Sequence, residues 1–211
     1  MHVILVHGWM SRPQMHFFPW LKKELEARGF EVAAPQMPNP ALPKRDEWLA
    51  TLDQAVSEID DPSQTILLGH SLGTLTILHY LNTFEKGPAF PHIILTAGFG
   101  RQFSLPQPID IPQIEDYPKL IALREKILNL PETVLHDWFS PAIDFAKVKP
   151  KARRWTCIHS TDDAIVPYAE GVWLAKKLNV PLITEHNGHL IEFRLNGQMT
   201  LPSALEAIVT T

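Results

Sequence analysis

The chemically most informative part of this sequence is one pentad of Gly-x-Ser-x-Gly type, Gly69-His70-Ser71-Leu72-Gly73. It stands between an apolar run, Thr65 to Leu68, and a segment of helical period. A serine on a sharp strand-to-helix turn adopts a strained backbone, and the flanking glycines leave room where strand and helix approach closely. Although such a pattern also arises by chance in glycine-rich turns, its position after an apolar run predicts that Ser71 is a nucleophile.

A serine hydroxyl needs a general base, and that base needs an acid that orients it. In hydrolases built on this kind of turn the chain order is serine, acid, histidine. Asp163 lies in an acidic turn before a helical segment, and His189 ends a later loop directly after Gly188. We therefore predict the catalytic triad Ser71, Asp163 and His189, with His189 taking the serine proton.

Each role has a competitor in the sequence. Asp162 is adjacent to Asp163, but the Asp-x-x-Val-Pro spacing that begins at Asp163 favours Asp163 as the acid, and Asp162 is expected to hydrogen-bond backbone in the turn. His186 competes with His189, and we expect it to be solvated or structural. His70 is expected to point away from Ser71 and to pack against the sheet.

The tetrahedral intermediate of acyl transfer needs an oxyanion hole of two backbone N–H groups. The N–H of Leu72, at the start of a helix, is one candidate, and the N–H of Trp9, in the loop after the first strand, is the other, with Met10 as its alternative. His7 is expected to be a hydrogen-bonded structural residue. We expect no cofactor and no metal site, because the ten histidines form no spacing typical of metal ligands.

Short apolar runs alternate with segments of helical period along the chain, which predicts a parallel sheet covered by helices on both faces. The expected fold is an α/β fold with about six mostly parallel strands, formed as a single domain over residues 1–211. The expected strands are His2 to Val6, Phe30 to Ala34, Thr65 to Leu68, His92 to Ala97, Trp155 to His159 and Leu182 to Thr184. The expected helices are one that begins near Pro19 and is capped by Gly29, one carrying Trp48, Leu52, Val56 and Ile59, and then Leu72 to Thr83, Tyr168 to Leu178 and Ser203 to Val209.

Residues 98–150 interrupt this alternation between the fourth and fifth strands. The segment holds one helical stretch near Lys119 to Leu130 and a shorter one near Glu132 to Phe139, and it is too long for a plain connection. An insertion there lies above the carboxyl ends of the strands, so we predict a lid or pocket wall. Its aromatic residues either line the pocket or simply pack onto the body: Phe99, Phe103, Tyr117, Trp138 and Phe139.

The composition limits the class of partner and the compartment. A formal net charge of -4 and a pI near 6.2 argue against binding to nucleic acid or to an anionic membrane surface. No apolar stretch is long enough for a membrane helix, and we expect no signal sequence. Cys157 is the single cysteine, which excludes an intramolecular disulfide and favours a cytoplasmic protein.

These landmarks resemble, in order and over nearly the whole chain, the family of small serine hydrolases that includes retinoblastoma-binding protein 9 and its bacterial relatives. The motifs that carry the resemblance are His7-Gly8-Trp9, Phe18-Pro19-Trp20-Leu21, Met37-Pro38-Asn39 with Pro43, Trp48-Leu49, the pentad around Ser71, Ser160-Thr161-Asp162-Asp163 and Gly188-His189. The resemblance implies a compact α/β-hydrolase fold without its first two strands, the same triad, and a segment Met37 to Pro43 that borders the active site. Residues 98–139 look longer than the family's usual excursion.

We therefore predict a serine hydrolase, in first place a carboxylesterase that cleaves small acyl esters through an acyl-enzyme intermediate. Two alternatives remain open. The same residues could serve a thioesterase, amidase or peptidase, because the triad defines how an acyl group is attacked and not which one. The resemblance also suggests a protein-interaction module on a hydrolase scaffold, and with it a protein partner.

Overall fold

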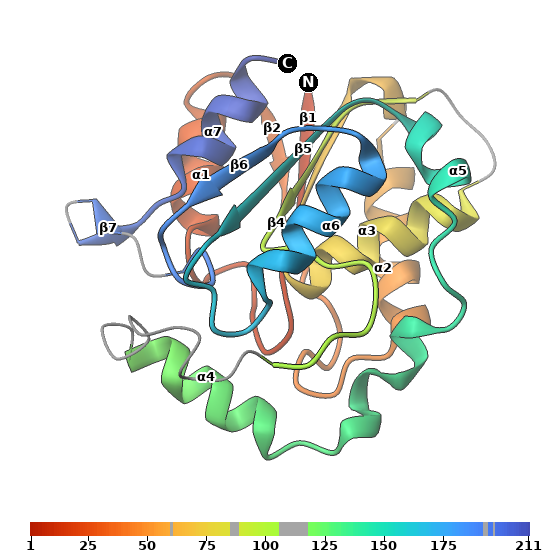
Figure 1. Cartoon of the computed structure of the whole chain (residues 1–211). Helices are drawn as coiled ribbons and strands as arrows, with labels where there is room; N and C mark the ends of the chain where they lie inside the picture. Colours follow the sequence, from red (N-terminus) through yellow and green to blue (C-terminus); the bar gives the residue numbers. More distant parts are fainter. Residues whose placement is uncertain (60, 85–88, 106–117, 192–193, 196) are drawn as a thin grey trace.

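The computed structural model describes residues 1–211 apart from 60, 85–88, 106–117, 192–193 and 196. Within the described residues, six parallel strands form one twisted sheet in the order β2-β1-β3-β4-β5-β6 (Figure 1). These strands are β1 (His2–Val6), β2 (Glu31–Ala33), β3 (Thr65–His70), β4 (Phe90–Thr96), β5 (Ala152–Ser160) and β6 (Leu182–Glu185). The prediction of an α/β fold with a mostly parallel six-stranded sheet is confirmed.

The strand registers bring the carboxyl ends of the central strands to one edge. Val6 of β1 is paired with Gly69 of β3, and the neighbouring residue of β3, His70, is paired with Thr96 of β4. All six residues of β3 are buried, as expected for a central strand covered on both faces. The loops after β1, β3 and β4 therefore begin side by side, where open α/β sheets bind ligands.

Helices cover both faces of the sheet (Figure 1). α1 (Phe18–Glu26) and α7 (Pro202–Val209) lie on one face, and α2 (Arg45–Ser57), α3 (Leu72–Thr83) and α6 (Tyr168–Leu178) lie on the other. Successive side chains of a strand point to opposite faces. Ile4 accordingly joins the core with α2 and α3, and Leu5 joins the core with α1 and α7.

The end of α1 shows why the chain turns back into the sheet. Gly29 has a φ of 82°, a conformation in which a side chain is strained. The N–H of Phe30 donates to the carbonyl of Leu25 at 3.1 Å, and the N–H of Gly29 to that of Glu26 at 3.0 Å. This pair of bonds is a Schellman motif, so the expected cap at Gly29 is confirmed.

In its described residues, the segment between β4 and β5 forms four short helical pieces. They are α4 (Pro118–Leu128), the 3-10 helix η4 (Glu132–Phe139), α5 (Phe145–Val148) and the 3-10 turn η5 (Lys149–Lys151). Trp138 holds this segment to the body, because its buried ring packs edge-on against Trp48 and its Nε1 donates to the carbonyl of Pro43 at 3.2 Å. Of the two alternatives given for Trp138, the structure shows packing onto the body of the protein.

Several smaller elements were not predicted, α5 and η5 among them. The 3-10 turn η1 (Pro62–Gln64) leads into β3, and an antiparallel hairpin joins β7 (Arg194–Leu195) to β8 (Gln198–Met199). Strands of two residues are too short for alternation to reveal them.

None of the helices in the described part of the chain has the length and apolar character needed to cross a membrane.

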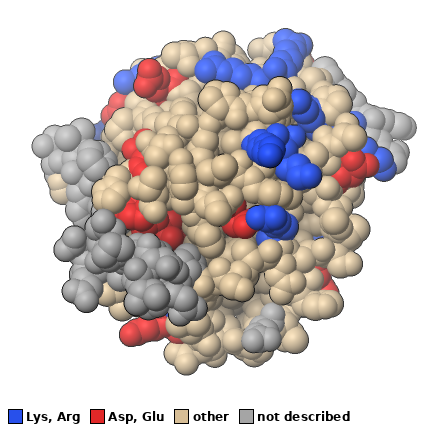
Figure 2. Space-filling model, viewed as in Figure 1, with Lys and Arg blue, Asp and Glu red and all other residues tan. Residues whose placement is uncertain are grey.

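Charged side chains of both signs are spread over the surface. On the face in Figure 2, acidic and basic side chains lie among uncharged ones. Several ion pairs in the described part of the chain are local and exposed, such as that of Lys22 with Glu26, and pairs of this kind contribute little to stability.

Candidate active site

Ser71 occupies the strained turn that the pentad predicts. It separates β3 from α3 with a φ of 53° and a ψ of -120°, a conformation that costs a residue with a side chain on the order of 1–3 kcal/mol. Two backbone hydrogen bonds hold the turn: the N–H of Ser71 donates to the carbonyl of Thr96, and the N–H of Thr74 donates to the carbonyl of Ser71, both at 2.9 Å. The turn is thus fixed from β4 and from α3.

Two glycines of the pentad are required by close backbone contacts. A Cβ on Gly73 would lie 2.2 Å from the carbonyl oxygen of Val6, and one on Gly69 would lie 2.7 Å from the oxygen of Gly73. Real Cβ atoms do not approach backbone this closely, so α3 can cross the end of β1 only with glycine at position 73, and glycine at position 69 leaves room for the first turn of α3.

Asp163 and His189 are joined by a short hydrogen bond. Nδ1 of His189 lies 2.7 Å from Oδ2 of Asp163, and both residues are buried. Oδ1 of the same carboxylate accepts the N–H groups of Ile165 at 2.8 Å and Val166 at 2.9 Å. Because a carboxylate only accepts, Nδ1 carries the proton, and Nε2 of a neutral His189 is left as an acceptor.

The surroundings keep Asp163 ionised. Burial by itself raises the pKa of this carboxyl, but the charge of His189 and hydrogen bonds from His159 and His189 lower the pKa well below its ordinary value. Nε2 of His159 lies 3.4 Å from Oδ2, on the side of the sheet. An ionised Asp163 is the form that can orient a histidine and stabilise its imidazolium.

Asp162 contacts the backbone of the histidine loop and not the imidazole of His189. Its Oδ1 accepts the N–H groups of Asn187 and Gly188, each at 3.1 Å. Asp162 was expected to bond the backbone of its own turn, but both of these bonds go to the loop that carries His189. The side chain of His186 is 58 % exposed and its Nδ1 lies 3.2 Å from the hydroxyl of Thr161, so it is the solvated histidine expected.

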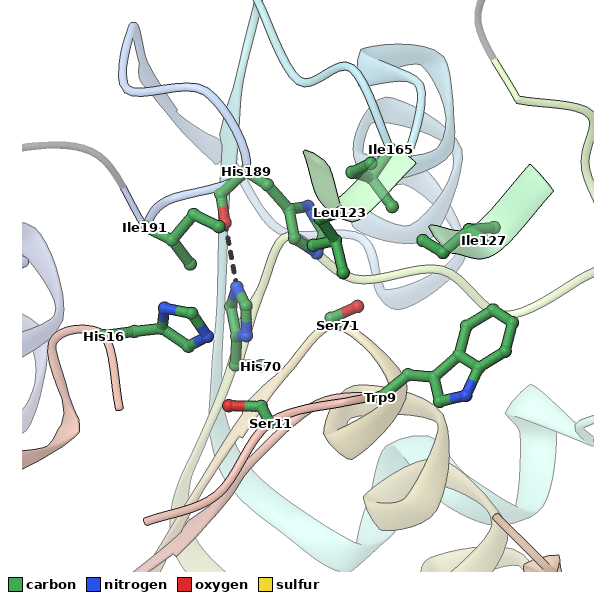
Figure 3. Close-up of a pocket in the computed structure, with 10 residues that line it drawn as sticks. All are labelled: Trp9, Ser11, His16, His70, Ser71, Leu123, Ile127, Ile165, His189 and Ile191. Atoms are coloured by element: carbon green, nitrogen blue, oxygen red, sulfur yellow. Dashed lines mark hydrogen bonds between the residues drawn. The ribbon is translucent and has the colours of Figure 1, made fainter. Parts of the chain in front are cut away.

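Ser71 and His189 line the same pocket, which is shown in Figure 3. The structure thus brings together three residues that are far apart in the sequence: the serine after β3, the acid after β5 and the histidine after β6. The remaining lining residues come from the loop after β1, from the end of β3, from α4 and from the turns after β5 and β6: Trp9, Ser11, His16, His70, Leu123, Ile127, Ile165 and Ile191.

The expectation for His70 is wrong. Its ring does not turn away to pack against the sheet but lines the pocket 4.9 Å from the ring of His189. Nε2 of His70 donates to the backbone carbonyl of His189 at 2.9 Å, and burial lowers the pKa of His70 well below 6.5. The backbone of the next residue, Ser71, has left the β conformation.

The two proposed oxyanion donors, the N–H groups of Leu72 and Trp9, come from different parts of the backbone near Ser71. Leu72 is the first residue of α3, so its N–H has no acceptor inside the helix. Gly8 lies so close that a Cβ there would be 2.9 Å from Cβ of Ser71, which brings the backbone that enters Trp9 beside the serine. The N–H of Met10 donates to the carbonyl of Pro40 at 2.8 Å and is therefore engaged elsewhere.

His7 has the structural role expected of it. Its Nδ1 donates to the carbonyl of Gly8 at 2.9 Å, and its Nε2 accepts the N–H of Met37 at 3.0 Å. The segment after Met37 borders the pocket, as the resemblance implied, because Nε1 of the pocket residue Trp9 donates to the carbonyl of Ala41 at 3.0 Å. In the described part of the chain, no three His, Cys, Asp or Glu side chains are grouped to hold a metal ion.

Leu123 and Ile127 of α4 are pocket residues that the sequence did not single out. The aromatic residues of the same segment do not line this pocket. Phe99 and Phe103 pack on each other, with centroids 5.0 Å apart, and Phe139 packs near Phe99. Tyr117 lies outside the described residues. The helical period of residues 119–130 was the signal that could have pointed to Leu123 and Ile127, which are four residues apart.

Comparison with known proteins decides the family. The family model described as serine hydrolase matches residues 3–194. The chain belongs to the serine hydrolase family. YdeN of Bacillus subtilis (strain 168) is 29% identical over 209 residues, which are 99% of this chain and 94% of YdeN. The serine hydrolase RBBP9 of Rattus norvegicus is 29% identical over 83 residues, 39% of either chain.

Solved structures share the α/β-hydrolase fold of this serine hydrolase. The crystal structure of the B. subtilis ydeN gene product has a TM-score of 0.77 at 29% identity and covers 99% of this chain and 97% of its own. The meta-cleavage product hydrolase CumD of Pseudomonas fluorescens IP01 has a TM-score of 0.63 at 16% identity, with coverage of 90% and 84%. The similarity to CumD concerns the fold alone.

Proposed function

We propose that this serine hydrolase is a carboxylesterase that acts on small acyl esters, with Ser71 as nucleophile, His189 as general base and Asp163 as the orienting acid. The observation that carries the proposal is the 2.7 Å hydrogen bond between Asp163 and His189 at the wall of the pocket that Ser71 lines. It leaves Nε2 of His189 as the acceptor that a serine hydroxyl requires.

The proposed reaction has two halves. Oγ of Ser71 attacks the ester carbonyl while Nε2 of His189 takes the hydroxyl proton, and the negative charge develops on the former carbonyl oxygen. The N–H groups of Trp9 and Leu72 are proposed to hold that oxygen, each contributing about 2.7–4 kcal/mol to transition-state stabilisation. His189 then returns the proton to the leaving alkoxide, and an acyl-enzyme remains.

Hydrolysis of the acyl-enzyme repeats these steps with water. His189 removes a proton from the water as it attacks the acyl carbonyl, and the same proton goes to Oγ of Ser71 when the acid leaves. The ionised Asp163 stabilises the imidazolium in both halves. No cofactor takes part in the proposed cycle.

The pocket supports a small, uncharged substrate. The empty space beside Ser71 is about 340 Å³ even with the open mouth counted in, which leaves room for a small substrate only. The lining contains no Asp, Glu, Lys or Arg among the described residues. We propose that Leu123, Ile127 and Ile165 contact the acyl chain, so that the insertion at 98–150 supplies a wall of the pocket.

The same lining argues against the other acyl-transfer activities. A peptidase or a thioesterase for large charged thiols gains from ionic contacts with its substrate, and no such side chain lines this pocket. The strained turn at Ser71 argues against a pure protein-interaction module, because strain of this kind persists only where the surrounding structure maintains it and usually serves a function.

We further propose a cytoplasmic location, which rests on the single cysteine.

A panel of nitrophenyl esters from acetyl to octanoyl, run beside aminoacyl nitroanilides, tests the proposal. We expect turnover of the short esters by the wild-type protein and none by Ser71→Ala. Turnover of the anilides alone would replace the esterase by a peptidase. Equal turnover by Ser71→Ala would contradict the assignment of the nucleophile.

A further inference from the structure

The pocket beside Ser71 has two walls of different chemistry. In Figure 3, Ser11, His16 and His70 lie on one side of Ser71, with Ile191 beside them, and Ile127 and Ile165 lie on the other. The ring of His16 is 6.2 Å from that of His70, which agrees with this grouping. An apolar acyl chain would pack against the apolar wall. The polar wall would bind a polar group of the substrate.

Two buried polar atoms on this wall have no hydrogen-bond partner among the described residues: Oγ of Ser11 and Nδ1 of His70. Ser11 is 4% exposed and His70 is 2% exposed. A buried polar group without a partner costs about 1–3 kcal/mol, so such groups call for an explanation by a ligand or water. Both residues line the pocket, so a ligand bound in the pocket could supply the missing hydrogen bonds.

The hydrogen-bonding character of the two atoms is fixed by the structure. Nε2 of His70 faces the carbonyl of His189, which can only accept, so Nε2 carries the proton. Nδ1 of the neutral ring is then an acceptor. The hydroxyl of Ser11 can donate or accept. A group that donates to Nδ1 and accepts from Ser11 satisfies both atoms, and a hydroxyl is the simplest such group.

The position of His70 indicates which part of an ester this hydroxyl belongs to. His189 must hand its proton to the leaving oxygen, so the alcohol part of the ester lies next to the ring of His189. The ring of His70 lies 4.9 Å from that ring. The polar wall therefore adjoins the alcohol part of the substrate, and the apolar wall is left for the acyl part.

We propose that Ser11 and His70 form a hydroxyl-binding subsite and that the preferred substrates are short-chain esters of diols or polyols, in which a free hydroxyl stands next to the ester. The subsite rests on the proposed function, since it takes Ser71 as the nucleophile. It deepens that function by assigning the alcohol part of the substrate, which the triad leaves open.

A matched pair of esters tests the subsite: 2-hydroxyethyl butyrate and propyl butyrate, which differ by a hydroxyl in place of a methyl group. We expect the wild-type protein to favour the hydroxyethyl ester by about tenfold or more in kcat/KM, because the analogue leaves the buried polar atoms unpaired. In Ser11→Ala we expect this ratio to fall at least about fivefold. The substitution removes no existing hydrogen bond, so the variant should fold.

Ser203→Ala is the matched control, because Oγ of Ser203 is also buried without a partner among the described residues but belongs to α7, outside the pocket lining. It should keep the wild-type ratio. A wild-type ratio near one would mean that water occupies the polar wall, and an unchanged ratio in Ser11→Ala would remove Ser11 from the subsite. Either result overturns the inference and leaves the esterase intact. If neither ester is cleaved the inference also fails, and covalent labelling of Ser71 by a fluorophosphonate then decides whether the hydrolase proposal fails with it.

Discussion

His159 contacts the same carboxylate oxygen of Asp163 that receives the hydrogen bond of His189. Nε2 of His159 lies 3.4 Å from Oδ2 of Asp163 and also donates to the carbonyl of Val166 at 3.0 Å. His159 is fully buried, and a Cβ on Gly171 would lie 2.5 Å from its Nδ1, so the ring has no room to move. The acid of the proposed triad is thus held from two sides.

This contact predicts that His159 is a positioning residue. Replacing His159 by Leu removes the Nε2 donor, so we expect kcat for a short ester to fall about tenfold with KM nearly unchanged. His159→Gln, whose amide can place a donor near Nε2, should recover most of kcat. Steady-state kinetics on both variants provide the measurement. Equal losses in the two variants, or a loss in KM alone, would assign His159 a purely structural role.

The two neighbouring aspartates should respond very differently to substitution. Asp163→Asn presents an amide to Nδ1 of His189 and favours the wrong tautomer, so we expect kcat to fall by about 10³–10⁴. In Asp162→Asn the side-chain oxygen can still accept the N–H groups of Asn187 and Gly188, so we expect a loss of less than about tenfold. Kinetics of the two variants under the same conditions check the ranking. The reverse ranking would move the acid to Asp162.

His92 should make the protein less stable at low pH. Burial, with a contribution from the charge of Arg154, lowers the pKa of His92 from 6.5 to about 4. Between these values the unfolded chain binds a proton that the folded chain does not, so the free energy of unfolding falls as the pH drops through 6.5 toward 4. From about pH 7.5 to about pH 5 the loss is about 2 kcal/mol.

His92→Gln removes the titrating group and keeps a side chain able to bond the hydroxyl of Thr156. Urea unfolding at the two pH values should therefore show a pH-dependent loss that is smaller by about 2 kcal/mol than in the wild type. Other buried histidines, such as His79, also have lowered pKa values, so part of the dependence should remain. An unchanged loss in the variant would contradict this role for His92.

The wall formed by α4 should limit the length of the acyl chain. Ile127→Ala shortens a side chain of the pocket lining, so we expect the ratio of octanoyl to acetyl ester hydrolysis to rise by about tenfold. Ile121→Ala is the control, because Ile121 lies on the same helix and packs against the core outside the pocket lining. Comparable ratios in the two variants would show that α4 does not contact the acyl chain.

Much of the fold could be predicted from local sequence. The helix from Leu72 to Thr83 has the predicted bounds, because a strained turn marks its start. The strand predicted at Trp155 begins earlier, at Ala152, since Arg153 and Arg154 are exposed at the start of the strand and interrupt the apolar run. Hydrophobic periodicity detects buried parts of a strand and does not detect exposed strand ends such as this one.

The pocket was less predictable than the residues of the proposed triad. Ser71, Asp163 and His189 stand in turns whose chemistry is local to a few residues. His70 and Ser11, by contrast, line the pocket because of how the loops after β1 and β3 pass one another. Leu123 is there because α4 lies across the carboxyl ends of the strands (Figure 1). Such tertiary placements leave no periodic signal in a single sequence.

The measurement that tests the central claim most directly is covalent labelling by a fluorophosphonate probe, with the modified residue located by mass spectrometry. The account predicts a single adduct on Ser71 in the native protein, slow labelling in His189→Ala and no labelling in Ser71→Ala. An adduct on another residue, or a native protein that stays unlabelled while a known serine hydrolase reacts beside it, would contradict the account.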